Sequence, residues 1–388
     1  MTEAQAAERR RARTIFRASI WLFPIVLTLC SCLGRPSPAP TTPTSTLATL
    51  SIGRVLYSAN GVDLWTASPD GANRKRITTD GATAGYLGAR WSPDGNFIAA
   101  ERSFPDESGT ALVVIRTADG SMWRITRRDT FLDGYSWSSD GRHLVYAELT
   151  SGGTLAAGGT LAGGVGDVHL YDVIERSDRV LAPGNHPAFA PDGLRVAFAH
   201  PRGAIAVVGL DGLPPVFIAD LAELSRVSAT RAAKGMGLLG APQWSADGKL
   251  LAYSAIERGE LLEALQIVYV QEAVPGAPQK QWALGKTGAI HHTAALRWSP
   301  TSRRLAYSFI YAQPHHHYIG VIDPAKQEPT VLFDSAKHFL DFSWSPDGSV
   351  ILLQNDDEDA WIYMKPDGGV FERRSPGGWR PDWCRCPS

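Results

Sequence analysis

The sequence contains few cysteines and no large excess of charge of either sign. Only four of its 388 residues are cysteine, and beyond the N-terminal region only Cys384 and Cys386 remain. A disulfide between residues so close in sequence would be strained, so we expect one of them to be packed and the other free or partly exposed. The formal net charge is −1 and no basic stripe is present, which argues against nucleic acid as a partner.

Motifs of several enzyme classes are also missing. The chain has no G-x-S-x-G sequence, which α/β-hydrolases use to expose a nucleophilic serine. The glycine-rich residues 150–166 lack the spacing of a phosphate-binding loop, and this composition predicts a flexible flap instead. No pair of a nucleophile and a base can be assigned from the sequence alone.

Residues 1–34 have the pattern of a secretory leader. A positive head rich in arginine precedes an apolar run at 18–29, and the sequence LCSC follows. Leu29 and Ser31 before Cys32 resemble a bacterial lipobox, so we expect Cys32 to be lipidated after cleavage. An uncleaved anchor and ordinary secretion remain alternatives. The stretch between Arg17 and Arg35 includes Pro24, and it is short for a helix that spans a membrane.

A tract rich in proline and threonine, residues 35–53, follows the leader. This composition predicts a semi-extended tether. All three interpretations of residues 1–34, a lipidated leader, an uncleaved anchor and ordinary secretion, therefore predict that residues 54–388 lie in the cell envelope, outside the cytoplasmic membrane. We expect a membrane contact through the N-terminal lipid or anchor.

One five-residue sequence recurs along the remaining chain. Serine, proline, aspartate and glycine in this order suit a type I β-turn, because proline presets its backbone angle and glycine accepts a positive φ. Alternating β-branched and aromatic residues follow each copy, which predicts a hairpin tip. WSPDG or a close variant occupies residues 91–95, 137–141, 189–193, 244–248, 298–302 and 344–348.

The spacing of these copies, roughly 40–55 residues, is that of a repeat architecture. Each interval accommodates four short strands, and repeated four-stranded antiparallel units predict an all-β protein, a single β-propeller. Residues 54–78 hold three strands without a turn motif, and Trp383 follows Pro381 as Trp244 follows Pro242. We therefore expect the C-terminal strand to complete the first blade, which gives seven blades and a closed ring without an exposed edge.

The motif residues are expected to have structural roles. The aromatic residue of each copy should pack between neighbouring blades, and the turns should lie on the face opposite the functional loops. The repeat residues assigned to this role are Trp91, Asp94, Gly95, Trp137, Asp140, Trp244, Asp247, Trp298, Trp344, Asp347 and Trp383.

These repeats resemble those of the TolB-type, WD-repeat-like propellers of bacterial envelopes, and the propeller domains of prolyl oligopeptidase relatives. The resemblance covers about residues 54–386 and implies the fold. TolB itself carries an α/β domain before a six-bladed propeller, whereas a short linker and seven blades are expected here. The resemblance therefore implies neither a TolA-binding role nor peptidase activity.

Five of the ten histidines are expected to gather on the loop face of one blade. His291 and His292 lie in the link into the sixth repeat, and the run 315–317 is placed in a loop of that repeat. Imidazoles at a shared rim can hold a transition metal such as zinc, for which His291, His315 and His317 are the candidates. A solvated loop without a metal and a pH-sensitive surface remain alternatives. Further candidates for the binding face are His316, Asp356, Asp357 and Glu358.

A second long loop, residues 219–239, also belongs to this face. Alanine, leucine, glutamate and lysine at 221–226 and 231–239 predict a short helix that caps the channel or meets a partner. Long loops on one face and short turns on the other indicate that the loop face is the functional one.

Two functions of different classes agree with the sequence. The first is a membrane-tethered envelope scaffold or receptor that binds a protein or peptide, which needs no catalytic residue. The second is a metal-dependent lyase or hydrolase that acts on extracellular polysaccharide or peptide through the histidines. Propellers serve both purposes, so the fold alone does not choose between them.

Overall fold

The computed structural model describes most of the chain after residue 52. No helix within this part is long and apolar enough to cross a membrane. The described residues are 53–59, 62–81, 83–104, 110–127, 131–151, 154–155, 161–162, 165–220, 236–258, 264–287, 295–312, 315–335, 341–355, 360–374 and 379–384.

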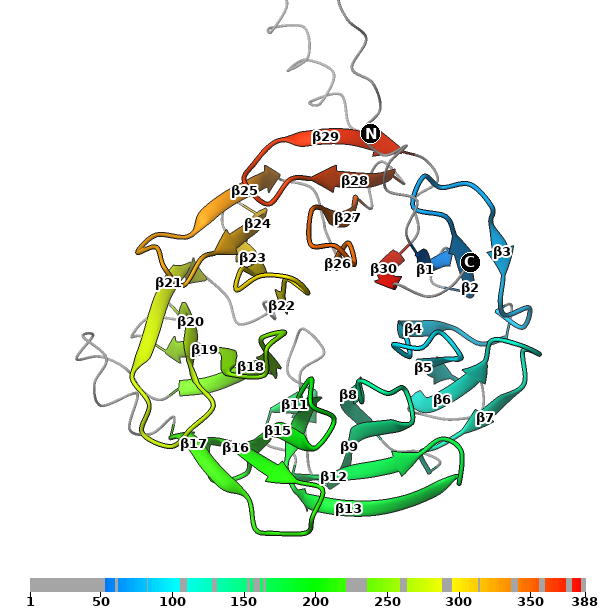
Figure 1. Ribbon diagram of the computed structural model, residues 1–388, viewed down its shortest axis with the longest axis horizontal. Coiled ribbons are helices and arrows are strands. Elements are labelled where there is room, and N and C mark those ends of the chain that lie inside the picture. Colours follow the sequence, from blue (N-terminus) through cyan, green and yellow to red (C-terminus); the bar gives the residue numbers. More distant parts are fainter. Residues whose placement is uncertain are drawn as a thin grey trace, which may run out of the picture. The chain divides into compact units, whose positions relative to one another are not determined.

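Seven four-stranded antiparallel sheets follow one another around an axis and form a seven-bladed β-propeller (Figure 1). This confirms the expected fold class. Blade 1 contains β30 (Trp379–Cys384), β1 (Arg54–Ala59), β2 (Asp63–Ala67) and β3 (Lys75–Arg76); blade 2 contains β4 (Tyr86–Trp91), β5 (Phe97–Ser103), β6 (Thr110–Arg116) and β7 (Met122–Arg124); blade 3 contains β8 (Phe131–Trp137), β9 (His143–Ser151), β12 (Val165–Asp172) and β13 (Ser177–Pro183).

Blades 4 to 7 repeat the same order from the innermost strand outwards. A separate two-stranded hairpin of β10 (Thr154–Leu155) and β11 (Leu161–Ala162) lies in the sequence between β9 and β12 of blade 3. The remaining strands are β14 (Asn185–Phe189), β15 (Arg195–His200), β16 (Ala204–Gly209) and β17 (Val216–Asp220); β18 (Met236–Trp244), β19 (Leu250–Arg258), β20 (Ala264–Glu272) and β21 (Gln279–Thr287); β22 (Leu296–Trp298), β23 (Leu305–Ala312), β24 (His315–Ile322) and β25 (Thr330–Ser335); and β26 (Phe342–Trp344), β27 (Ile351–Asn355), β28 (Ala360–Met364) and β29 (Val370–Arg374).

Strands from the two ends of the propeller share blade 1. β30 pairs with β1 so that Val55 faces Trp383 and Leu56 faces Asp382, and the strand order is β3-β2-β1-β30. The C-terminal strand therefore closes the ring as expected, and no blade is left without an inner strand.

The motif aromatic residues fill the spaces between blades. Trp298 at the inner edge of blade 6 packs against Val268 and Val270 of blade 5, and Trp344 packs against Ile319 and Val321 of blade 6. Burial of such large side chains contributes about 2–3 kcal/mol each. The hydrophobic core of the protein is thus a series of inter-blade layers.

Hydrogen bonds join the same positions at all seven interfaces. At four of them the indole N–H donates to the carbonyl oxygen of the residue before the aromatic residue of the preceding blade. At the other three, a main-chain N–H donates to a side chain at that position. The indole bonds are Trp137 to Arg90 (3.3 Å), Trp244 to Ala188 (3.1 Å), Trp298 to Gln243 (3.0 Å) and Trp344 to Arg297 (2.9 Å); the others are Phe189 to Ser136 (3.2 Å), Trp383 to Ser343 (3.1 Å) and Trp91 to Asp382 (2.8 Å).

The motif serine organises each turn from a buried position. Ser92 is fully buried, and its hydroxyl donates to Asp94 at 2.6 Å while it accepts from the main-chain N–H of Phe97 at 2.9 Å. Gly95 follows with a φ of 75°. Ser138, Ser245 and Ser345 make the equivalent bonds to the aspartates two residues on. Each turn is therefore held by its own side chains.

Adjacent turns also touch one another around the ring. A Cβ atom on Gly141, whose φ is 72°, would lie 2.7 Å from an Asp94 carboxylate oxygen of the preceding blade. Asp94 is already bonded to Ser92 and to the main-chain N–H of Asn96, so it has little freedom to move. The motif glycine is required here both for its conformation and for its lack of a side chain.

Three expectations about local structure are wrong. β18 begins at Met236 and pairs with β19, so the end of the expected helix at 231–239 is a strand; the rest of 221–235 lies outside the described residues. The histidine run 315–317 begins β24 and pairs with residues 310–312 of β23. Sheet pairing overrides the local composition in both places. Cys384 is neither simply packed nor free but disulfide-bonded.

We predict that Gly141→Ala destabilises the propeller by about 2–3 kcal/mol, because the methyl group adds a clash with Asp94 to the backbone strain. Gly212→Ala is the matched control, since Gly212 has a φ of 82° and no atom within 4 Å of the added Cβ. It should cost about 1 kcal/mol. Urea unfolding measures both. Equal losses of stability in the two variants would contradict the role of the contact between the turns of neighbouring blades.

Candidate functional site

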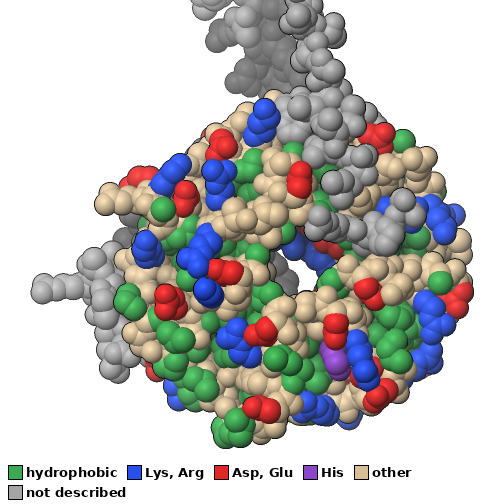
Figure 2. All heavy atoms as spheres, in the orientation of Figure 1, with side chains coloured by type: hydrophobic (Ala, Val, Ile, Leu, Met, Phe, Trp, Pro, Cys, Tyr) green, Lys and Arg blue, Asp and Glu red, His purple; other side chains and the backbone are tan. Residues whose placement is uncertain are grey.

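A cavity of about 700 Å³ lies at the axis of the propeller. The inner strands of the blades line it, and Figure 2 shows the opening with basic and acidic side chains on its wall. Its volume is in the range of small-molecule and peptide sites. The acidic, basic and histidine side chains that line it are Arg90, Glu101, Asp133, His186, Arg297, Asp341, Arg380 and Asp382.

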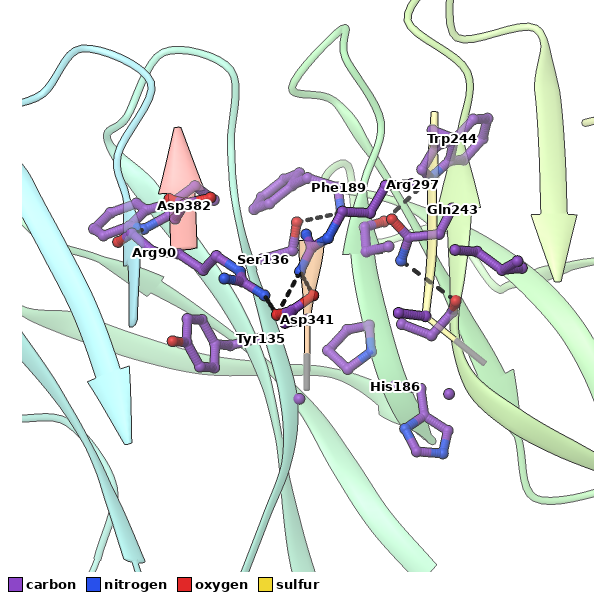
Figure 3. A pocket seen from close by; sticks show the side chains of 18 of the residues that line it. Arg90, Tyr135, Ser136, His186, Phe189, Gln243, Trp244, Arg297, Asp341 and Asp382 are labelled. Carbon is purple, nitrogen blue, oxygen red and sulfur yellow. Dashed lines mark hydrogen bonds and ion pairs between the residues drawn. The ribbon is translucent and has the colours of Figure 1, made fainter. Parts of the chain in front are cut away.

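One carboxylate in the cavity binds two arginines. Asp341 lies between Arg90 and Arg297 (Figure 3), at 2.7 Å from the first guanidinium and 3.0 Å from the second. Burial acts to raise the pKa of Asp341, but the two guanidinium groups outweigh it and hold this pKa well below its usual range. The three groups therefore remain charged at neutral pH.

This ion-pair cluster connects blades that are not neighbours. Arg90 belongs to blade 2 and Asp341 immediately precedes β26 of blade 7, so their ion pair spans blade 1, the blade that closes the ring. Asp382 of β30 adds a hydrogen bond to the main-chain N–H of Trp91. We infer that the cluster of Arg90, Asp341 and Arg297 stabilises the ring at blade 1, the seam where the two ends of the propeller meet. This cluster is called the clasp below.

Three polar groups converge beside Gly88. A Cβ atom at Gly88 would lie 3.5 Å from a Glu101 oxygen and 3.7 Å from both an Arg380 nitrogen and the Tyr135 hydroxyl. Burial raises the pKa of Glu101, although Arg380 and Arg90 act against this rise. Burial also raises the pKa of Tyr135, whose hydroxyl donates to main-chain oxygens of Gly88 and Ala99. Tyr135 is therefore a neutral phenol and a fixed part of the wall.

Five consecutive inner strands have bulges that shape this part of the cavity. The pairing register shifts in β30, β4, β8, β14 and β18, and a residue with positive φ lies in each shift. Bulges of this kind redirect side chains. The five residues are Arg380 (54°), Gly88 (61°), Gly134 (87°), His186 (53°) and Gly240 (73°).

A histidine and a carboxylate from neighbouring blades pair in the same region. The Nδ1 atom of His186 lies 3.1 Å from a carboxylate oxygen of Asp133, and both side chains are largely buried in the wall. Such a contact fixes the orientation of the ring and favours one tautomer. The pair can accept or donate a proton, or bind a polar ligand.

Most of the site residues expected from the sequence lie outside the described part of the chain. This is so for His291, His292, Asp356, Asp357 and Glu358, and for the side chains of His315 and His316. His317 is buried, with 3% of its surface exposed. Among the described residues, no three His, Cys, Asp or Glu side chains form a group that could hold a metal ion. The metal site remains a prediction.

Sequence reasoning missed the axial cluster, although a signal was present. Arg90, Arg297 and Asp382 each precede a motif aromatic residue, in a strand that lines the axis. A charged residue at that position of an otherwise β-prone strand indicates a polar channel. His186 and Arg380 stand three residues before the aromatic residue, where the equivalent residues of blades 2 and 3 are glycines.

The fold and the axial cavity define the chain as a seven-bladed propeller with a polar channel. It matches no family model and no curated protein sequence. Among solved structures it is similar to oligogalacturonate lyase from Vibrio parahaemolyticus, with a TM-score of 0.53 and 14% identity over 83% of this chain and 91% of that one. An oligogalacturonate lyase in complex with manganese gives 0.51 and 14%, over 76% and 79%.

TolB from Acinetobacter baumannii gives a TM-score of 0.48 and 18% identity, over 87% of this chain and 69% of that one. At these identities the likenesses show the fold alone. The propeller fold that the turn motif and its resemblance implied is confirmed by the seven sheets of the structure.

We predict that Asp341→Asn destabilises the protein by about 3 kcal/mol at neutral pH, because two guanidinium groups lose their counter-ion. The depressed pKa of Asp341 stabilises the fold above the unfolded value of about 3.9, and this contribution is lost as the pH falls through the folded value. The loss of stability at low pH that protonation of Asp341 causes should therefore be absent from the variant.

Urea unfolding between acid and neutral pH measures both effects. Asp119→Asn, which breaks an exposed pair with Arg116, is the control and should leave the midpoint unchanged. An Asp341→Asn protein as stable as the parent would contradict the role of the clasp.

Proposed function

We propose that this protein is a membrane-tethered propeller of the cell envelope that binds a protein or peptide, an extended segment of which enters the axial cavity. The observation that carries the proposal is a pair of oppositely charged side chains on the cavity wall, those of Arg380 and Glu101. Neither Arg380 nor Glu101 forms a hydrogen bond or close ion pair within the described structure. An extended segment offers donors and acceptors along its length and can satisfy both kinds of group.

Apolar side chains at the loop-face end of the inner strands support this proposal. Leu87 in β4 and Phe131, the first residue of β8, are 37% and 39% exposed. Both precede the bulges, on the side of the propeller where the links between blades enter. Exposed apolar groups beside a polar cavity are typical of a surface that receives another chain.

The envelope location rests on the leader and on the redox state of one cysteine. The leader pattern before Cys32 favours export, and lipidation of Cys32 supplies the tether. A disulfide at Cys384 supports an oxidising compartment, where such bonds persist. Cys32→Ala should release the protein from the membrane fraction, and retention of the variant would contradict lipid anchoring.

We predict that Leu87→Ser combined with Phe131→Ser weakens partner capture at least tenfold, since each buried apolar side chain contributes about 1.5–3 kcal/mol. The measurement is cross-linking in native envelopes, followed by quantification of the captured protein. Leu194→Ser combined with Leu213→Ser is the matched control, because these leucines are 65% and 64% exposed but lie in connections on the opposite face. Equal capture by both double variants would contradict a partner on the loop face.

A second candidate function is a lyase or hydrolase for extracellular polysaccharide or peptide. The specific observation in its favour is the pair of His186 and Asp133, since a carboxylate that orients a histidine is a common arrangement for a general base. Two solved structures with this fold are named as oligogalacturonate lyases, one with manganese. The histidines proposed to hold a metal are His291, His315 and His317.

The enzyme candidate predicts turnover that depends on His186 and on a bound metal. Uronate oligosaccharides are the first substrates to test, through the ultraviolet absorbance of an unsaturated product. Untagged protein should contain near-stoichiometric metal that is lost in the triple alanine variant of His291, His315 and His317. His186→Ala should lower the rate at least 100-fold. Metal-free protein without turnover would remove this candidate.

A further inference from the structure

Blade 3 contains a histidine whose two ring nitrogens both face carboxylates. His169 lies on β12, which is paired with β9 on one side and with β13 on the other (Figure 1). Its Nδ1 atom is 2.9 Å from a carboxylate oxygen of Asp178 on β13, and its Nε2 atom is 3.9 Å from a carboxylate oxygen of Glu148 on β9. The first distance is that of a hydrogen bond and the second that of an ion pair. This position favours the protonated form of the ring.

The ring of His169 is buried and held in one orientation. Tyr146 of β9 stacks on it, with the ring centroids 4.8 Å apart and the planes 15° from parallel. Burial raises the pKa of Tyr146, so this neighbour is a neutral phenol. Only 9% of the surface of His169 and 6% of that of Glu148 are exposed. A carboxylate buried to this extent is costly without a positive partner.

Acidic groups dominate the surroundings of His169. Burial acts to lower its pKa, but Asp178, Glu148 and Asp167 outweigh burial and raise this pKa. Tyr171 follows two residues later on the same strand, and burial raises its pKa as well, so it adds no charge. Among the described residues, Glu148 forms no ion pair other than that with His169.

The basic side chains of the neighbouring elements are engaged or placed elsewhere. Arg176, in the turn between β12 and β13, lies over the ring of Trp123. Arg124 of β7 donates to the main-chain oxygens of Thr126 and Arg127, and Arg127 itself is exposed. His169 therefore supplies the positive charge beside Glu148.

Glu148 connects blade 3 to the link that enters it from blade 2. Its other carboxylate oxygen accepts a hydrogen bond of 3.3 Å from the main-chain N–H of Arg127, which follows β7 in the sequence. The same link leads to Phe131, the first residue of β8, and the next residue, Leu132, pairs with Glu148. The charge of His169 thus acts on the residue that anchors both the link and the start of β8.

The proton that His169 can lose is the one that faces Glu148. An ionised carboxylate can only accept hydrogen bonds, so Nδ1 keeps the proton that it donates to Asp178. The proton on Nε2 is therefore the one that passes to solvent when the ring becomes neutral. The buried carboxylate of Glu148 then faces a nitrogen lone pair in place of a positive N–H group, and their attraction ends.

We propose that His169 is a pH-dependent latch for the link between blades 2 and 3. In its protonated form it holds Glu148 in the position from which this carboxylate binds Arg127. In its neutral form it releases Glu148, and the link and the first residues of β8 loosen. The proposal rests on the proposed function only where Phe131 contacts a partner, since a loosened link weakens that surface.

The latch is closed on the acid side of the titration. A histidine whose pKa is raised in the folded state contributes stability that is fully present below the unfolded value of about 6.5. This contribution is lost as the pH rises through the folded value. The link should therefore be held at mildly acidic pH and should loosen as the pH rises above about 6.5.

The test combines histidine titration with hydrogen exchange on the full protein. NMR spectra of protein with labelled histidine give the titration midpoint of His169, assigned through its absence from His169→Gln. Hydrogen exchange, expressed as protection factors to remove the intrinsic effect of pH, reports opening at Arg127 and Phe131. Protection should fall at least about tenfold, the change that one pKa unit represents, over the pH range in which His169 titrates.

Glu148→Gln distinguishes the latch from a purely structural role. The amide keeps an acceptor for the N–H of Arg127 but carries no charge. The titration midpoint of His169 should fall, and protection at the link should no longer depend on pH. His143→Gln is the matched control, because this histidine also lies in blade 3 and faces a carboxylate, that of Asp172 at 3.6 Å. It should leave the midpoint of His169 and the protection of the link unchanged.

The outcomes separate the latch from the proposed function. An unchanged midpoint in Glu148→Gln, equal protection of the parent protein at both ends of the titration, or a pH-dependent loss that persists in His169→Gln overturns the latch. Partner capture, measured by cross-linking at each pH, should fall together with protection at Phe131. Capture that does not change while the link loosens contradicts the effect of the latch on the partner. Absence of capture at every pH, with the link responding as expected, contradicts the proposed function alone.

Discussion

The structure depends on one repeated interaction between neighbouring blades. The motif aromatic residue of each blade packs on the preceding sheet, and an N–H group of the same residue bonds to the position just before the preceding aromatic residue. Packing alone is not directional, whereas the hydrogen bond fixes the relative height of two inner strands. Seven such bonds set a common register for all the strands that line the axis.

This register also determines where charge can be placed. The position before the aromatic residue is the one that accepts the bond, and it includes Arg90, Arg297 and Asp382. In two of these the main-chain carbonyl is used, so the side chain is free to enter the cavity and bind Asp341. In Asp382 the carboxylate itself accepts the bond. One structural rule thus yields both the wall of the channel and the clasp across its seam.

The repeat architecture could be predicted from the sequence because it depends on local chemistry. The turn motif, the alternating strands after it and the lone Trp383 were enough for seven blades and their closure. The predicted helix at 231–239 failed because β18 gains its stability from pairing with β19, which brings Met236 opposite Glu257, a residue well outside the segment itself. Residue preference within a short window does not contain that information.

The axial site was harder to predict for a different reason. Arg90 and Asp341 are 251 positions apart in the sequence, and only ring closure brings them together. The positive φ of His186 and Arg380 is likewise a property of the bulges and not of the residues. Three residues before the aromatic residue, four blades have a glycine or an alanine, and the other three have Arg380, His186 and Asp341. Comparison of this position between blades would have marked these three as the polar exceptions.

Closure by β30 has a consequence for the order in which the protein can acquire its structure. Until residues 379–384 are synthesised, blade 1 has three strands, and the blades on either side of it lack the partner that β30 provides. The edge of β1 that β30 covers stays unpaired throughout the synthesis of the other blades, and β4 and β26 lack the strand that packs between them. The ring of a nascent chain therefore stays open until β30 has been synthesised, so closure of the propeller is the last step in its folding.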